Sequence, residues 1–145
     1  MKLEIRKMTV GDLEKGLSEL LERKTGKGMT KEKLEKILSF STIVRIVAED
    51  TNVGKIVGMV SLLFEQKMVM DCSVCCYLND VIMSEEYEQS HLYGQILDIV
   101  IKICKERKIN RLFAYSEQEL GESMKKKGFK SQGQFYQKIL IEKKK

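Results

Sequence analysis

Apolar residues follow two different periods along the chain, and each period predicts a different kind of element. Alternation of apolar and polar residues predicts a strand, whereas apolar residues three and four apart predict one face of a helix. Strands are expected over residues 2–8, 43–49, 55–64, 68–70, 74–83, 111–115 and 134–141. Helices are expected over residues 9–25, 30–38, 94–106 and 119–127. This order predicts one mixed α+β domain that occupies residues 1–145.

The expected helix ends carry residues that favour caps, because the chain contains no proline. Thr9 and Thr30 stand at predicted N-caps. Gly26 and Gly128 stand at predicted helix ends, where glycine adopts the left-handed conformation readily. Gly58 lies inside a predicted strand, so we expect a bulge or a close contact there.

Composition favours a folded protein in a reducing aqueous compartment. Apolar residues make up 43% of the chain, which is enough for a core. No run approaches the roughly 18 apolar residues that cross a membrane. The first ten residues alternate like a strand, and no apolar block typical of a signal peptide follows them. The expected location is therefore the cytoplasm, without a membrane partner.

Positive charge is concentrated near the end of the chain. The formal net charge is +5, and residues 125–127, 130 and 143–145 are all lysines. These lysines do not alternate with aromatic residues in a basic stripe, so a nucleic-acid partner is not expected. A modest positive potential favours small anionic ligands.

The four cysteines include one C-x-x-C pair, Cys72 and Cys75, which raises the question of a metal site. A structural zinc ion needs four ligands, and His91 is the only histidine of the sequence. Residues three apart on a strand point to opposite faces, so the pair would diverge. We therefore expect buried, reduced thiols and no metal.

Residues 87–97, YEQSHLYGQIL, join a predicted strand to a predicted helix. A strand followed by a short loop and a helix start directs free backbone amides at a phosphate group. Such loops are usually rich in glycine, yet this one holds only Gly94. On this pattern alone, an ordinary capped helix start remains an alternative.

Five short motifs match one family of enzymes. They are residues 54–58 (GKIVG), residues 61–67 (an S-x-x-x-E-x-K strand), Cys72, residues 78–81 (LNDV, for I-E-D-V) and residues 127–129 (KGF). Together with the order of the elements, they resemble the GNAT acetyltransferase superfamily over nearly the whole chain. Within it, the chain is most similar to the glucosamine-6-phosphate N-acetyltransferase family.

The resemblance implies the GNAT acyl-CoA N-acyltransferase fold, with acetyl-CoA as co-substrate and no metal. It implies that the backbone of Val81, Ile82 and Met83 aligns the thioester and the pantetheine arm. With one extra residue after Tyr87, it also implies a set of pyrophosphate-binding loop residues. These are Gln89, Ser90, His91, Leu92, Tyr93 and Gly94. The side chain of His91 either contacts a phosphate or is exposed.

The resemblance also assigns the acceptor site. Asp80 is implied as the acid that orients or deprotonates the substrate amine. The implied contacts to the sugar phosphate are Thr25, Lys67, Met68, Val69, Met70, Asn79 and Asp80, with Lys67 supplying charge. Family members are dimers whose last strand helps to form this site, so a homodimer is expected.

Four positions depart from the family pattern. Asn79 replaces a Glu, and Met70 replaces a His. Met124 stands where the family has the Tyr that protonates the leaving thiolate, and Leu120 where it has an Asn that contacts coenzyme A. The favoured interpretation is acetylation of glucosamine 6-phosphate, a step towards UDP-GlcNAc. The alternatives are a GNAT enzyme for another amine and a degenerate member that binds coenzyme A without turnover.

Overall fold

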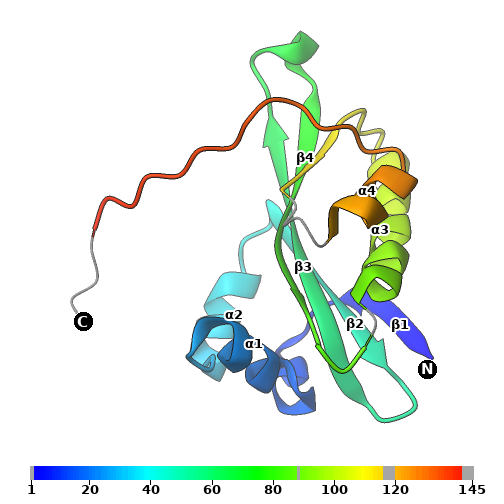
Figure 1. Ribbon diagram of the computed structural model, residues 1–145. Coiled ribbons are helices and arrows are strands. Elements are labelled where there is room, and N and C mark those ends of the chain that lie inside the picture. Colours follow the sequence, from blue (N-terminus) through cyan, green and yellow to red (C-terminus); the bar gives the residue numbers. More distant parts are fainter. Residues whose placement is uncertain (1, 88, 116–119, 142–145) are drawn as a thin grey trace.

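A five-stranded sheet forms the centre of the protein (Figure 1). The computed structural model describes residues 2–87, 89–115 and 120–141, without the side chains of residues 89 and 90. Strands β1 (Leu3–Lys7), β2 (Ile43–Asp50), β3 (Lys55–Gln66), β4 (Val74–Met83) and β5 (Leu112–Ala114) lie side by side in that order. The first four are antiparallel neighbours, and β5 pairs parallel to β4.

Helices cover both faces of the sheet (Figure 1). One face carries the 3-10 helix η1 (Val10–Lys15) with α1 (Leu17–Thr25) and α2 (Lys31–Leu38). The long helix α3 (Gln89–Glu106) and the short α4 (Gly121–Lys126) lie on the other face. The predicted α+β class is confirmed, with helices on both sides of a mixed sheet.

The alternation along the strands divides the core between these two faces. Val60, Leu62 and Leu78 pack with Ile96 and Leu97 of α3 in one cluster. The second cluster, under α1 and α2, contains Leu17, Leu20, Leu34, Val47 and Met59. Each large apolar side chain that is fully buried contributes about 1.5–3 kcal/mol to folding. Period-two patterning of the central strands therefore specifies both layers.

Gly58 lets α3 approach the sheet closely. A Cβ atom at this position would lie 3.4 Å from Cδ1 of Ile96 and 3.6 Å from Cδ2 of Leu92. The pairing also shifts here, because Ala48 faces Gly58 while Glu49 faces Ile56. Both features predicted for this glycine, a bulge and a close contact, are confirmed.

The first predicted helix is interrupted at Gly16. This residue has a φ of 94°, a left-handed conformation that ends η1 before α1 begins. Both predicted caps hold, since the amide of Thr9 donates to Asp12 at 2.8 Å and Thr30 accepts from the amide of Lys33 at 3.2 Å. The sequence pattern missed the break because the apolar period continues across it.

Helix α3 begins at Gln89, five residues before the predicted start at Gly94. Leu92 and Tyr93 are fully buried and continue the apolar face that Ile96 and Leu97 carry on. No strong helix breaker separates these residues, since a glycine inside a helix costs only about 1 kcal/mol. The glycine was therefore a poor marker of the helix start.

Two predicted strands are wrong. Residues 68–70 lead into a 3-10 turn, η2 (Met70–Cys72), in which Met70, Asp71 and Cys72 all have φ near 56–59°. Residues 134–141 contain no strand, and Phe135, Tyr136 and Ile139 are exposed. Their apolar alternation is that of a strand, but they pair with no strand among the described residues. The predicted start of the last helix, Glu119, lies outside the described residues.

The cysteines differ from the expectation at one position. Cys75, Cys76 and Cys104 are buried, whereas Cys72 is exposed in the η2 turn. All four thiols are free. In the described ranges, the His, Cys, Asp and Glu side chains form no group of three or more that could hold a metal ion. None of the helices in these ranges has the length and apolar character that crossing a membrane requires.

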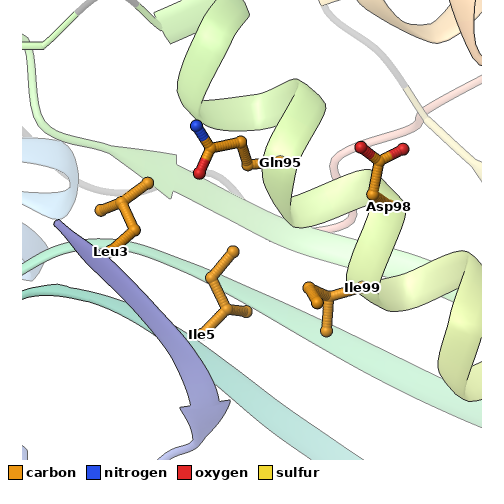
Figure 2. Close-up of a pocket in the computed structure, with 5 residues that line it drawn as sticks. All are labelled: Leu3, Ile5, Gln95, Asp98 and Ile99. Atoms are coloured by element: carbon orange, nitrogen blue, oxygen red, sulfur yellow. The ribbon is translucent and has the colours of Figure 1, made fainter.

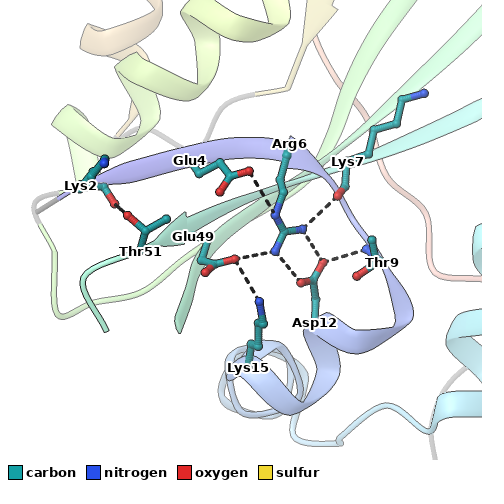
Figure 3. A network of polar contacts seen from close by, with 9 residues as sticks. All are labelled: Lys2, Glu4, Arg6, Lys7, Thr9, Asp12, Lys15, Glu49 and Thr51. Atoms are coloured by element: carbon teal, nitrogen blue, oxygen red, sulfur yellow. Dashed lines mark hydrogen bonds and ion pairs between the residues drawn. The ribbon is translucent and has the colours of Figure 1, made fainter. Parts of the chain in front are cut away.

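A network centred on Arg6 fastens β1 to β2 and η1 (Figure 3). Its guanidinium makes two hydrogen bonds to the carboxylate of Asp12, at 2.8 and 2.9 Å, and one to Glu49 at 2.6 Å. Burial raises the pKa of Asp12, but hydrogen bonds from Arg6 and the amide of Thr9 outweigh burial and lower it. Arg6 likewise lowers the pKa of Glu49. We call these three residues the Arg6 network.

Candidate active site at the β4 bulge

Strand β4 carries a bulge in its C-terminal half. Ile82 pairs with Met59 and Asn79 pairs with Ser61, so Asp80 and Val81 together face the single residue Val60. Asp80 has a φ of 51°, a conformation that Asp and Asn tolerate better than most residues. A bulge interrupts the ladder and redirects side chains, and bulges are frequent beside active sites. The predicted catalytic residue Asp80 thus lies in the bulge itself.

Side chains of two other strands, β2 and β3, bind the carboxylate of Asp80. Its Oδ2 accepts from Nη1 of Arg45 on β2 at 2.8 Å and from Oγ of Ser61 on β3 at 3.1 Å. Nη1 of Arg45 also donates to Oγ of Ser61. The side chain of Asp80 is nevertheless 59% exposed, and both recorded contacts fall on one oxygen. The arrangement fixes the carboxylate through Oδ2 and, among the described residues, leaves Oδ1 without a recorded hydrogen bond.

The sequence analysis missed Arg45 and Ser61. Arg45 lies inside the apolar stretch of residues 43–47, and a charged residue there was a signal of a polar partner on the same face of the sheet. Its side chain is only 16% exposed, and among the described residues its Nε has no hydrogen-bond partner. Only the register of β2, β3 and β4 brings these three positions together. We call Arg45, Ser61 and Asp80 the Arg45 network.

A cavity opens where β4 and β5 separate. The parallel ladder ends at the pair formed by Leu78 and Ala114. Beyond it lies a cavity of about 240 Å³. The residues that line it are Leu78, Asn79, Asp80, Val81, Tyr115 and Leu120. The gap exposes the bulged segment of β4 to a narrow ligand that enters between the two strands.

The segment between β4 and α3 is tied to the rest of the sheet. The amide of Ser84 donates to the carbonyl of Val57 at 2.8 Å, and the hydroxyl of Tyr87 donates to Asp50 at 2.7 Å. This hydrogen bond lowers the pKa of Asp50 and, together with burial, raises that of Tyr87 to about 12. These hydrogen bonds fix Ser84 and Tyr87, which follow the bulged strand.

The predicted pyrophosphate loop is the first turn of α3 rather than a loop before it. The first amides of a helix lack partners within it, and among the described residues these belong to residues 89–91. Leu92, Tyr93 and Gly94 come after these amides, so their assignment as phosphate-binding amides does not fit the helix start. The side chains of Leu92 and Tyr93 are buried in the core, where burial raises the pKa of Tyr93 to about 12.

His91 lies on the exposed side of this first turn. Its Nε2 is 2.8 Å from Nε2 of Gln95, one helical turn further on. The contact runs along α3, so the imidazole lies beside the helix.

The residues whose backbone was expected to align the thioester are half-buried at the end of β4. They are Val81, Ile82 and Met83.

The predicted sugar-phosphate residues fall in separate places. Lys67 is at the end of β3, with Nζ 3.4 Å from Oε1 of Glu65 and 3.3 Å from the hydroxyl of Tyr77. These contacts, Tyr77 first, raise the pKa of Lys67. Met68, Val69 and Met70 follow it as exposed apolar side chains. Asn79, by contrast, is exposed beside Asp80 and lines the same cavity.

Thr25 is remote from this segment. It ends α1, whereas residues 66–73 form the tip of the β3–β4 hairpin at the opposite end of the molecule (Figure 1). Its hydroxyl lies 2.8 Å from the carbonyl of Leu21 and 2.9 Å from that of Lys27. Within one chain, α1 and the tip of the β3–β4 hairpin therefore lie apart (Figure 1).

A second cavity, of about 310 Å³, lies between β1 and α3 (Figure 2). Leu3, Ile5, Gln95, Asp98 and Ile99 line it. Asp98 already pairs with Lys127 at 2.8 Å, and the other side chains are apolar or an amide. The one carboxylate of this cavity is thus paired with a lysine, whereas Asp80 keeps one oxygen without a recorded contact among the described residues, so the bulge of β4 is the better candidate.

Comparisons with known proteins agree with this geometry. The model of the Acetyltransferase (GNAT) family matches residues 15–125. Glucosamine 6-phosphate N-acetyltransferase 1 of Dictyostelium discoideum is 29% identical over 103 residues, which are 66% of this chain and 64% of that protein. The glucosamine 6-phosphate N-acetyltransferase of Arabidopsis thaliana is 26% identical over 109 residues, 70% of this chain and 72% of that protein. The chain thus spans less than two thirds of the length of the Dictyostelium relative.

A solved structure extends the likeness to the fold. The crystal structure of glucosamine-6-phosphate N-acetyltransferase from Arabidopsis thaliana superposes with a TM-score of 0.85 at 24% identity. The superposition covers 97% of this chain and 100% of that one.

Proposed function

Because the chain belongs to the GNAT acetyltransferase family, we propose that it transfers the acetyl group of acetyl-CoA to an amine, and that glucosamine 6-phosphate is the amine. The observation that carries the proposal is the bulge of β4. It presents the carboxylate of Asp80 at the cavity between β4 and β5. The names of the two curated relatives support this acceptor.

Coenzyme A would lie along the C-terminal half of β4. The pantetheine arm would enter the cavity beside Asn79 and Val81, which puts the thioester next to the bulge. The pyrophosphate would lie at the first turn of α3, where free amides and a helix dipole of about +0.5 charge favour an anion. Residues 89–91 would supply those amides.

Asp80 would hold the substrate amine. An amine must lose a proton before or during attack on a thioester, and a fixed carboxylate orients it and accepts that proton directly or through water. Arg45 and Ser61 occupy Oδ2, which would leave Oδ1 for the amine. Peptide N–H groups freed from the ladder by the bulge would stabilise the developing charge on the thioester oxygen.

The acceptor phosphate would meet Lys67, a cation already held by Glu65 and Tyr77. Helix α1, which ends at Thr25, lies apart from the tip of the β3–β4 hairpin (Figure 1), so Thr25 would contribute from a second copy of the chain. The proposed glucosamine 6-phosphate site therefore goes together with a homodimer. Cytoplasmic location and a step towards UDP-GlcNAc belong to the same proposal.

A different amine is the second candidate. Asn79 is neutral and exposed beside Asp80, and the segment after Lys67 presents three apolar side chains. These residues suit an acceptor that is less anionic than a sugar phosphate. Glucosamine, spermidine and a peptide with a free amino terminus represent such acceptors.

The test is titration calorimetry with acetyl-CoA, followed by thiol release after addition of each amine. Binding with fastest turnover of glucosamine 6-phosphate supports the proposal. Binding with faster turnover of another amine supports the second candidate. Binding without turnover of any amine means that the protein binds coenzyme A without catalysis. Absence of binding refutes both proposed enzymatic functions.

A further inference from the structure

Acyl transfer from a thioester leaves a thiolate that gains a proton, and the cavity holds one side chain placed to supply it. We propose that Tyr115 is this catalytic acid, an inference that rests on the proposed acetyltransferase function. It lines the cavity at the end of β5, on the side opposite Asp80 and Val81. The departing sulfur of coenzyme A would lie between them.

The end of the parallel ladder places Tyr115 there. Leu78 and Ala114 are the last pair, so Asn79 and Tyr115 are the first residues beyond it on the two separating strands. The bulge begins one residue later, at Asp80. Tyr115 therefore directly follows β5, at the point where β5 separates from the strand that carries the bulge.

Elimination among the cavity residues gives the same answer. Leu78, Val81 and Leu120 carry no ionisable proton, and the amide of Asn79 is a poor acid. Asp80 is committed to Arg45 and to the amine. Among the described residues that line the cavity, the phenol of Tyr115 remains as the proton donor. Met124 of α4 is buried in the core and has no proton to give.

Contact with the C-terminal segment orients the ring. The rings of Tyr115 and Phe135 have centroids 4.7 Å apart at an interplanar angle of 40°. Tyr115 is 57% exposed, so this contact limits the positions that its ring can take. Phe135 is thus a positioning residue, whereas Tyr115 itself would contact the sulfur.

The step balances without a further reactant. The amine nitrogen bonds to the carbonyl carbon, the carbon–sulfur bond breaks, and the phenolic proton moves to the sulfur. The proton that leaves the nitrogen passes to Asp80 or water, and the phenolate recovers a proton from water. The products are the amide and free coenzyme A.

Tyr115→Phe tests the assignment, because it removes the proton and keeps the ring against Phe135. Loss of a general acid lowers kcat by about 10²–10⁴-fold. We expect a loss of that order with acetyl-CoA and little change in the calorimetric Kd. Tyr136→Phe is the matched control; Tyr136 is 82% exposed, and its hydroxyl bonds to Gln134. Its kcat is expected to equal that of the unmodified protein.

Two thioesters with different leaving groups distinguish a catalytic acid at Tyr115 from a residue with a structural role. Aryl thioesters release thiolates that are stable without a proton, so the deficit of Tyr115→Phe in kcat/KM should shrink to about threefold or less with acetyl thiophenol. A deficit that is equal for both thioesters, or a kcat unchanged with acetyl-CoA, overturns the inference while the proposed function stands. If the unmodified protein turns over no amine, the proposed function fails and the inference fails with it.

Discussion

Arg6 and Arg45 each bind an aspartate of another element, and the two aspartates differ in how deeply they are buried. In the Arg6 network, Asp12 is 1% exposed and both of its oxygens are bound by the guanidinium. In the Arg45 network, Asp80 is 59% exposed and only one oxygen is bound. An arginine–aspartate pair stabilises the fold when the carboxylate is buried and both of its oxygens are bound. It can serve as a reactive group when the carboxylate is held but still reaches solvent.

Asp80→Asn separates chemistry from stability and should have the largest effect. The amide keeps the shape and the tolerance for positive φ, but it cannot accept the proton of the amine. We expect kcat to fall by about 10²–10⁴-fold. The free energy of unfolding should change by less than about 1 kcal/mol, as is typical of exposed ion pairs. Steady-state kinetics and urea unfolding of the same preparation measure the two quantities. A large loss of stability would mean that Asp80 has a structural role, as Asp12 does.

Asp12→Asn should do the reverse. It leaves the guanidinium of Arg6 without one buried partner, and breaking a buried pair destabilises a protein by about 3–5 kcal/mol. Urea unfolding measures the loss. The matched control is Asp98→Asn, whose side chain is 59% exposed and pairs with Lys127 at the surface. Its effect should stay below about 1 kcal/mol; equal effects of the two substitutions would contradict the comparison.

Acid should weaken the Arg6 network. The pKa values of Asp12 and Glu49 are lowered in the folded protein from ordinary values of 3.8 and 4.5. The unfolded chain therefore binds protons more readily, so the stability from these groups is present above those values and is lost as the pH falls further. The urea midpoint should drop between about pH 5 and pH 3, and less steeply in Asp12→Asn. A flat profile in the unmodified protein would remove the electrostatic argument.

Tyr93→Phe should have the smallest effect and sharpens the contrast with buried groups that are bound. Its hydroxyl is buried and has no hydrogen-bond partner among the described residues. An unsatisfied buried polar group costs about 1–3 kcal/mol. Removing it should leave the free energy of unfolding unchanged or raise it by about 1 kcal/mol. A clear loss of stability by thermal or urea unfolding would mean that the hydroxyl has a partner in solution.

The fold was predictable where side-chain periodicity and burial agree. The central strands and both predicted threonine caps were found because each expresses a local rule. The turn at Met70, Asp71 and Cys72 was missed because it has left-handed residues without glycine or asparagine. The C-terminal segment was misread because alternation predicts a strand only where another strand lies beside it.

The candidate site was predictable in part for a related reason. Asp80 could be named from a motif that is local in sequence. Arg45 and Ser61 are 35 and 19 residues away, so only the strand register reveals that they bind it. The position of Tyr115 depends on where the β4–β5 ladder ends, which no local motif reveals. Local patterns therefore identify candidate groups, whereas pairing decides which of them meet.

The left-handed backbone at Asp80 has a consequence for how this sequence can change. A φ of 51° carries strain for a residue with a Cβ, and glycine would relieve it. A population selected for thermal stability alone would therefore drift towards glycine here and lose the carboxylate. Glycine at this position in a variant would therefore indicate selection for folding stability rather than for the carboxylate.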